Sequence, residues 1–183
     1  MKNTLNTHIK DYIAQSLILL LKQKPFDEIK INEICQKAGV NRSSFYRNFA
    51  NKEQAIVFYL QLNMLPAFLA RQPFTRNKDI FVAIFHSIND MGEVVDLLYV
   101  NDLSHIFLQY IKDCCGAKPV FDDEEAYRTS LIMGLVFGSL DEWIRRGRVQ
   151  TPDDMADKIG EHLKRIGENW DALSDEHQPA STE

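Results

Sequence analysis

The 183-residue sequence has little of three features that mark other classes of protein. Its three cysteines are an odd number, which favours reduced thiols over a framework of disulfides. Apolar runs such as Leu17–Leu21 and Leu131–Phe137 are too short to cross a bilayer. Because the sequence also shows no charged start followed by an apolar segment and a cleavage site, we expect a cytoplasmic protein with no membrane partner.

Motifs for catalysis are absent as well. The sequence has no nucleophile motif, no glycine-rich phosphate loop and no helix with two metal-spaced histidines. The adjacent cysteines Cys114 and Cys115 lack the spaced Cys and His partners of a tetrahedral zinc site. We therefore expect no enzyme, no cofactor and no metal. A thiol sensor of soft ions at this pair stays open as an alternative.

Charge is divided unevenly along the sequence. The net charge is −5, yet residues 1–60 hold nine Lys or Arg and five Asp or Glu, which gives this part +4 and the remainder −9. A basic N-terminal module can face phosphates, whereas an acidic body is repelled by them. The division is compatible with nucleic-acid binding by the N-terminal part alone.

The residues from Ile31 to Phe49 have the pattern of two short helices joined by a tight turn. Gly39 can adopt the left-handed backbone that ends the first helix, and Asn41 can cap the second. The first helix carries one apolar stripe at i, i+3, i+4 and i+7, formed by Ile31, Ile34, Cys35 and Ala38.

The second helix of this pair has only two strongly apolar side chains at helical spacing, Phe45 and Phe49. One face can therefore pack against the first helix, while a face with arginine, serine and tyrosine is left for a partner. These side chains can bond phosphate oxygens and base edges in a major groove. The alternative is an ordinary helical hairpin whose polar face meets only water.

The wider segment from Lys24 to Ile56, KPFDEIKINEICQKAGVNRSSFYRNFANKEQAI, resembles the DNA-binding domain of the TetR family of bacterial transcription regulators. The resemblance extends from Ile9 to about Tyr59. One departure is Lys30, where the family usually carries a threonine that caps the first motif helix and touches a phosphate. The residues that carry the resemblance are Ile34, Ala38, Gly39, Val40, Phe45, Tyr46, Phe49, Lys52 and Glu53.

The resemblance implies a helix-turn-helix that reads double-stranded DNA. Arg42, Ser43 and Ser44, at the start of the second motif helix, are the candidates for base-edge or sugar contacts. Lys30 could still meet a phosphate through its side chain, although the helix cap must then come from elsewhere. The candidates for phosphate contacts are Tyr46, Arg47 and Lys52.

Apolar periodicity and cap signals predict an all-α fold throughout. Helices are expected over residues 4–23, 51–70, 77–92, 94–111 with a break at Asn101 and Asp102, 122–146 and 152–170. We expect a three-helix DNA-binding domain at residues 1–50 and a helical effector-binding and dimerisation domain at residues 51–170. The polar residues 171–183 lack periodicity and are expected to be a disordered tail.

The middle helices contain more aromatic residues than a small core needs, and the family resemblance implies a small-molecule pocket between them. An effector there must bind the DNA-competent and DNA-incompetent states unequally. Packing of these side chains in a core, with no ligand, is the alternative. The candidate effector-pocket residues are Phe81, Phe85, His86, Tyr99, Phe107, Tyr110 and Met133.

The last two long helices are candidates for a dimer interface, because the first is apolar nearly all round and contains small residues that permit close approach. The family dimerises through its last two helices. Simple completion of one core is the alternative. The candidate interface residues are Leu131, Leu135, Gly138, Trp143, Met155, Ile159, Leu163 and Ile166.

Together these features predict a homodimeric repressor that binds an inverted-repeat DNA operator and responds to a small-molecule effector. Two heads about one DNA turn, ~34 Å, apart would match such a site. One alternative is a TetR-fold coactivator or adaptor that binds protein and does not read DNA, for which Lys30 is the only hint. Another is a helical-bundle metal or cofactor protein.

Overall fold

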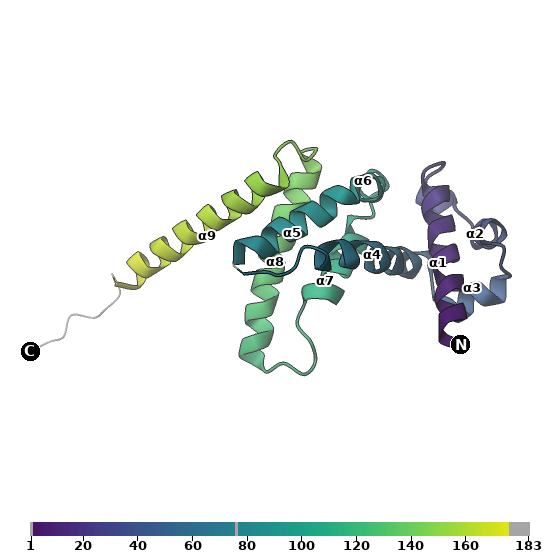
Figure 1. The fold of residues 1–183 in the computed structure, drawn as a ribbon, viewed down its shortest axis with the longest axis horizontal. Helices are drawn as coiled ribbons and strands as arrows, with labels where there is room; N and C mark the ends of the chain where they lie inside the picture. The colour runs from purple at the N-terminus through teal and green to yellow at the C-terminus, as the bar shows by residue number, and fades with distance from the viewer. Residues whose placement is uncertain (1, 76, 176–183) are drawn as a thin grey trace, which may run out of the picture.

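The computed structural model describes the backbone of residues 2–75 and 77–175, and the side chains of residues 7–75 and 78–165. Within these ranges all regular structure is helical, which confirms the predicted all-α fold (Figure 1). The elements are α1 (Lys2–Leu21), the 3-10 turn η1 (Phe26–Glu28), α2 (Ile31–Ala38), α3 (Arg42–Asn48), α4 (Lys52–Leu69), α5 (Asn77–Asp90), α6 (Gly92–Val100), α7 (Ser104–Cys115), α8 (Asp123–Arg145) and α9 (Pro152–Asp175).

The first three helices form a separate head at one end of the molecule (Figure 1). Helix α1 packs along α2 and α4 through an apolar face that includes Ile13 and Leu17, both fully buried. Phe26 and Ile29, in and just after the η1 turn, are also buried and belong to the same apolar core.

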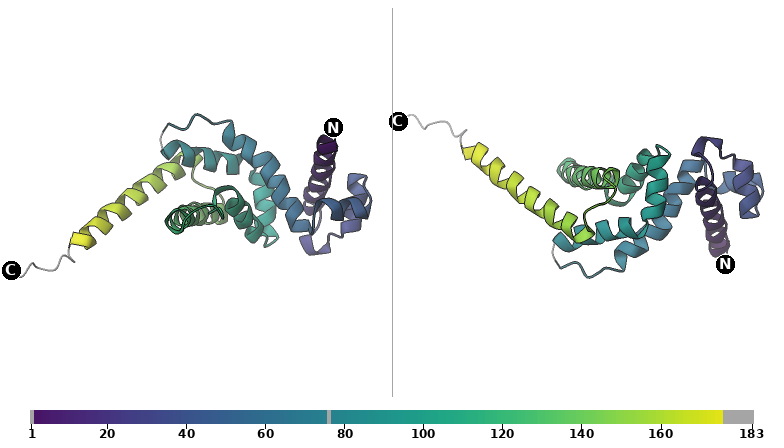
Figure 2. Two further views of the ribbon diagram at one scale, coloured as in Figure 1. Left: turned by 90° about the horizontal axis from the view of Figure 1, so that it is seen from below. Right: turned by 90° about the horizontal axis from the view of Figure 1, so that it is seen from above.

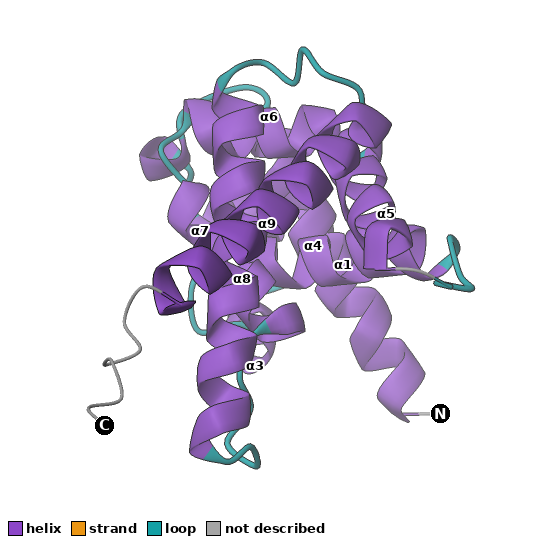
Figure 3. Ribbon diagram, turned by 90° about the vertical axis from the view of Figure 1, so that its left-hand side faces the viewer, coloured by secondary structure: helices purple, strands orange, loops and turns teal. Residues whose placement is uncertain are grey.

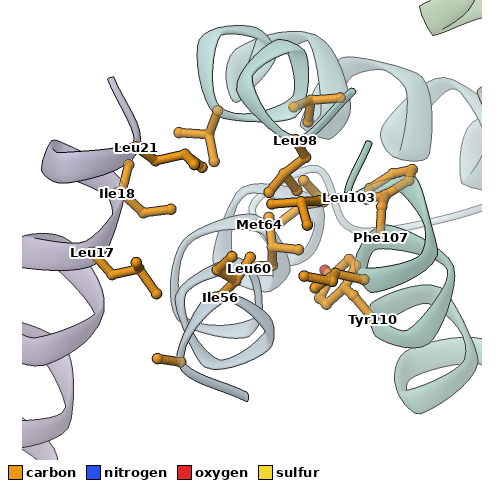
Figure 4. Close-up of a cluster of buried hydrophobic side chains, with 14 of the residues drawn as sticks. Leu17, Ile18, Leu21, Ile56, Leu60, Met64, Leu98, Leu103, Phe107 and Tyr110 are labelled. Atoms are coloured by element: carbon orange, nitrogen blue, oxygen red, sulfur yellow. The ribbon is translucent and has the colours of Figure 1, made fainter. Parts of the chain in front are cut away.

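Helix α4 joins the head to the body. It begins where expected, because the Asn51 side chain accepts a hydrogen bond from the Gln54 amide at 2.9 Å and the Gln54 side chain accepts one from the Ala50 amide at 2.8 Å. Figure 4 shows Ile56 and Leu60 of α4 between the apolar side chains of α1 and those of α6 and α7. Head and body therefore share one continuous apolar core along α4.

Polar contacts join α6 and its C-terminal end to the head and also to the turn after α8. The Lys22 ammonium at the end of α1 lies 2.6 Å from the Glu93 carboxylate of α6. The Arg148 guanidinium, from the turn after α8, makes two hydrogen bonds of 2.6 Å to the Asp96 carboxylate, also on α6. In addition, the Phe26 amide donates to Asn101 Oδ1 at 3.1 Å, just beyond the end of α6.

Helix α9 packs mainly against α5, where Ala156 is buried, and then leaves the body (Figures 1 and 2). Its start agrees with the sequence, since the Asp154 amide donates to Thr151 Oγ1 at 3.1 Å. It runs to Asp175, so residues 171–175 of the expected tail are helical, while residues 176–183 lie outside the described residues. No described helix is both long and apolar enough to cross a bilayer.

Viewed from the α9 end, the first half of α8 projects below the rest of the body (Figure 3). Its exposed apolar side chains include Leu131 and Ile132, with exposed fractions of 67% and 51%. A groove between α8 and α9 is lined by side chains of both helices.

Candidate nucleic-acid interface

Helix α2 is capped without the threonine that the family usually carries. The Lys30 amide donates to Glu33 Oε2 at 2.8 Å, and the Lys24 ammonium donates to Glu33 Oε1 at 2.6 Å. These two bonds, first that from Lys24 and then that from the Lys30 backbone, lower the pKa of the Glu33 carboxyl. The side chain of Lys30 is thereby left exposed at the start of α2, on the protein surface.

The turn between the two motif helices has the predicted geometry. Gly39 adopts φ 67°, the left-handed region that glycine enters without a Cβ penalty, and the Val40 amide donates to the Cys35 carbonyl at 2.9 Å. Asn41 then caps α3, because its side-chain oxygen accepts from the Ser44 amide at 2.8 Å and from the Ser43 hydroxyl at 2.7 Å. The turn fixes the direction of α3 relative to α2.

Helix α3 is anchored by one face and exposed on the other. Phe45 is 0% exposed and Phe49 is buried beside it, with ring centroids 6.1 Å apart. Arg42, Ser43 and Arg47 are exposed, Tyr46 is 48% exposed and Ser44 is half-buried. The predicted contact residues of α3 therefore share the solvent-facing side of one short helix.

Arg42 is held in place by its neighbours. Its Nη2 donates to the Tyr46 hydroxyl at 3.2 Å, and its guanidinium carbon lies 5.4 Å from the centre of the Tyr46 ring. Its Nη1 lies 3.5 Å from Asn32 Oδ1 on α2, at the limit of a hydrogen bond. The sequence argument missed Asn32; its position on the polar side of the first motif helix was the only available signal.

Lys52 has a different environment from the predicted phosphate contact. Its ammonium donates to the carbonyls of Phe26 at 2.6 Å and Ile29 at 2.9 Å, and it lies 4.1 Å from the centre of the Phe26 ring. Burial lowers the pKa of this ammonium group. Lys52 thus braces the η1 turn against the start of α4 and is turned away from the exposed face of α3.

The predicted effector residues are not gathered around one cavity. Phe85 and Phe107 are buried in the core, and His86 pairs with the Asp153 carboxylate of α9 at 2.9 Å. The Tyr99 hydroxyl donates to the Asp141 carboxylate at 2.7 Å, while Phe81 and Met133 are half-buried packing residues. Only Tyr110 of the set lines the partly open apolar cavity of about 170 Å³ between α4, α5, α7 and α8.

Most of the predicted interface residues do meet on one surface. Leu131 and Gly138 are exposed on α8, and the side chain of Ile166 lies outside the described residues. Trp143 is only 1% exposed and forms the floor of a groove between α8 and α9 of about 510 Å³, where its indole nitrogen donates to the Gln150 carbonyl at 3.0 Å. The other predicted residues that line this groove are Leu135, Met155, Ile159 and Leu163.

Comparison with known proteins finds similarity to bacterial regulatory proteins, in agreement with the helix-turn-helix geometry of the head. Residues 18–56 match the family profile described as bacterial regulatory proteins, tetR family. The transposon Tn10 TetC protein of Escherichia coli is 25% identical over 171 residues, which cover 82% of this chain and 85% of that protein. A TetR transcriptional regulator of known structure from Streptococcus agalactiae 2603V shares the fold, with a TM-score of 0.51 and 16% identity over 86% of this chain and 94% of that one.

Proposed function

Since the chain belongs to the TetR family of bacterial regulatory proteins, we propose that it is a homodimeric transcription repressor that binds an inverted-repeat operator and is released by a small molecule. The observation that carries the proposal is the exposed polar face of α3, anchored from behind by Phe45 and Phe49. It lies in the part of the chain with a net charge of +4, whereas the remainder carries −9.

In this proposal α3 enters the major groove, which at ~12 Å is wide enough for one helix. Arg42, preset by Tyr46, is the candidate for a bidentate contact with guanine, and Ser43 and Ser44 follow it along the base edges or sugars. Arg47 and Lys30 are candidates for phosphates, together with the Tyr46 hydroxyl. Lys52 contributes by holding the motif against α4.

The dimer is proposed to form through α8 and α9. The groove between them and the exposed stripe of Leu131, Ile132 and Leu135 offer apolar area that the protomer leaves uncovered. A second copy of the chain related by a twofold axis would cover both and present a second α3. Leu131→Asp is expected to convert the dimer to monomers in analytical ultracentrifugation, while Val149→Asp, at an exposed position outside this stripe, is not.

Repression follows from occupancy of a promoter in the cytoplasm, and induction follows from unequal effector binding. A small molecule that binds the DNA-incompetent dimer more tightly lowers operator affinity by the ratio of its two affinities. Helix α4 is the physical link, because its first residue is bonded to the head and its last turns line the body cavity.

The direct test of this function is capture of genomic DNA. Full-length protein should retain a small set of fragments with a common inverted repeat, and fluorescence anisotropy should give tight binding that weakens steeply with salt. A doubly substituted Arg42→Ala, Arg47→Ala protein, with its helical content unchanged, should retain none of them. Retention of the same fragments by this variant would overturn the assignment of α3 as the reading helix.

A further inference from the structure

A partly open cavity in the body is lined by side chains from four helices. Met64 of α4, Ile88 of α5, Ile111 of α7 and Val136 of α8 are all buried and converge on a space of about 170 Å³. Leu65 and Ile80 also line it but are partly exposed, so the cavity opens to solvent between α4 and α5. The opening gives a small molecule a way in from the surface.

No charged side chain lines this cavity, and its polar side chains are already paired. The Ser87 hydroxyl donates to the Ala83 carbonyl at 2.6 Å, and the Tyr110 hydroxyl is hydrogen-bonded with the Cys114 thiol. The walls therefore present mostly carbon and sulfur atoms and no charged group that could pair with a charged ligand. A charged group buried there would lose its favourable hydration free energy and would gain no opposite charge in exchange.

The two cysteines at the end of α7 belong to the same lining. Both residues are exposed, and the partial burial of their thiols raises the pKa of Cys114 and of Cys115. Neutral thiols are poor nucleophiles and poor ligands for soft metal ions, and they pack as small apolar groups. The pair therefore lies at the rim of the cavity and contributes two uncharged sulfur atoms to its wall.

We propose that the effector expected in this cavity is a small, uncharged, apolar molecule, no larger than one six-membered ring with short substituents. This inference rests on the proposed function, because a ligand of this cavity is an effector only if the protein is a ligand-responsive repressor. The size limit follows from the volume, because an apolar cavity of ~150 Å³ is known to hold benzene, whereas drug-sized ligands need ~300 Å³ or more.

Such a ligand would act on the head through α4. Met64, Leu65 and Phe68 in the second half of α4 contribute one wall of the cavity, and Lys52 at the start of the same helix is bonded to the head. Filling the cavity favours the α4 position that leaves most room beside α5 and α7. DNA affinity then changes by the ratio of the ligand affinities for the two α4 positions.

Toluene, benzoate and benzylamine are matched probes, since they share one ring and differ in charge. Toluene should bind the full-length dimer, measured by the change in its ligand-observed NMR signals and by a rise in Tm, and the two charged probes should not. Equal binding of benzoate or benzylamine, or no binding of toluene, would overturn the proposal.

Cysteine labelling locates the bound probe. With toluene at about ten times its Kd, the reaction of N-ethylmaleimide with Cys114 and Cys115 should slow about tenfold by mass action. Cys35 is buried in the head and remains unlabelled while the protein is folded, so it reports unfolding within the same sample. Toluene that binds without protecting either rim cysteine would contradict the location.

A variant whose cavity is filled by a larger side chain tests the location of the site independently of the labelling. Val136→Phe places a ring in the cavity and should remove toluene binding, whereas Val120→Phe makes the same substitution at a position that is 87% exposed and should leave it unchanged. If Val136→Phe exposes Cys35 to labelling, Ser87→Leu replaces it as the filling variant. Toluene binding that survives in a folded filled variant would overturn the proposal.

Failure of the cavity proposal and failure of the proposed function are separated by a second readout. Operator affinity of the same proteins is measured with and without toluene. Toluene binding in the cavity with unchanged operator affinity supports the ligand class and counts against control of DNA binding from this site. Operator binding that is intact in a protein that takes up no toluene supports the regulator and overturns the ligand class.

Discussion

The head and the body of this protein use their aromatic residues in opposite ways. In the head, Phe45 and Phe49 sit behind a helix whose other face is polar and exposed, so packing on one side orients chemistry on the other. In the body, Phe85 and Phe107 fill the core itself, and the cavity that remains is lined mostly by aliphatic side chains. In the head, the spacing of residues along one helix is enough to identify the functional face. In the body, the functional site can be identified only from the way several helices pack together.

The largest expected effect comes from removing the support of α3. Phe45→Ala leaves a void behind the reading helix and should cost about 3–5 kcal/mol, which unfolds the head first. Operator binding should be lost and Cys35 should become reactive toward N-ethylmaleimide, while sedimentation should still report the proposed dimer through α8 and α9. Retained DNA binding would show that the head does not depend on this packing.

Lys52→Met tests whether this lysine braces the head or touches DNA. The substitution keeps the side-chain stem but removes the ammonium bonds to Phe26 and Ile29, and should lower stability by about 1–2 kcal/mol. Operator affinity should fall while its dependence on salt stays as in the wild type. A salt slope reduced by about one unit would instead identify Lys52 as a phosphate contact.

Two arginines of α3 separate base reading from backbone binding. Arg42→Ala should cost about 1–3 kcal/mol at the operator and relax preference at particular bases. Arg47→Ala should weaken binding across all sequences and reduce the salt slope by about one unit. Anisotropy titrations on the operator and on single-base variants distinguish these outcomes, and identical behaviour of the two variants would contradict the assigned roles.

A smaller effect is expected from Asn32, which contacts Arg42 from the neighbouring helix. Asn32→Ala should reduce base preference by less than Arg42→Ala does, because the guanidinium loses one of its two polar neighbours. In the Arg42→Ala background the same substitution should have no further effect. Additive losses in this double-mutant cycle would mean that Asn32 acts on DNA independently.

The smallest effect concerns Glu33, whose pKa is lowered by Lys24 and by the Lys30 amide. A carboxyl whose pKa is lower when folded stabilises the head above its unfolded pKa, and this stability is lost as pH falls through the folded pKa. Thermal unfolding from pH 7 down to pH 3 should therefore show a decline that is shallower in Glu33→Gln. Equal profiles would remove Glu33 as the cap of α2.

Local signals in the sequence were sufficient for the helices and for the motif. Gly39 and Asn41 act through their own backbone and immediate neighbours, so their roles at helix ends were predicted and are found in the structure. The exposed face of α3 followed in the same way from the spacing of Phe45 and Phe49. Such features depend on residues within one or two helical turns.

Features that depend on distant segments could not be predicted. Lys52 has a long flexible side chain, and only the folded position of η1 reveals that its ammonium meets two carbonyls there. Tyr99 and His86 were aromatic residues in the right region, but Asp141 and Asp153, far along the chain, engage them in polar contacts. The cavity likewise could not be predicted from the sequence, because it is the space that four packed helices leave unfilled.

The most direct test of the reading head is a hydroxyl-radical footprint of the full-length protein on a captured operator fragment. Two protected patches with centres one helical turn, ~34 Å, apart and on one face of the duplex are expected, because each protomer inserts one α3. Both patches should disappear with the Arg42→Ala, Arg47→Ala protein. A single patch, or two patches that survive this substitution, would contradict DNA reading by α3 in a dimer.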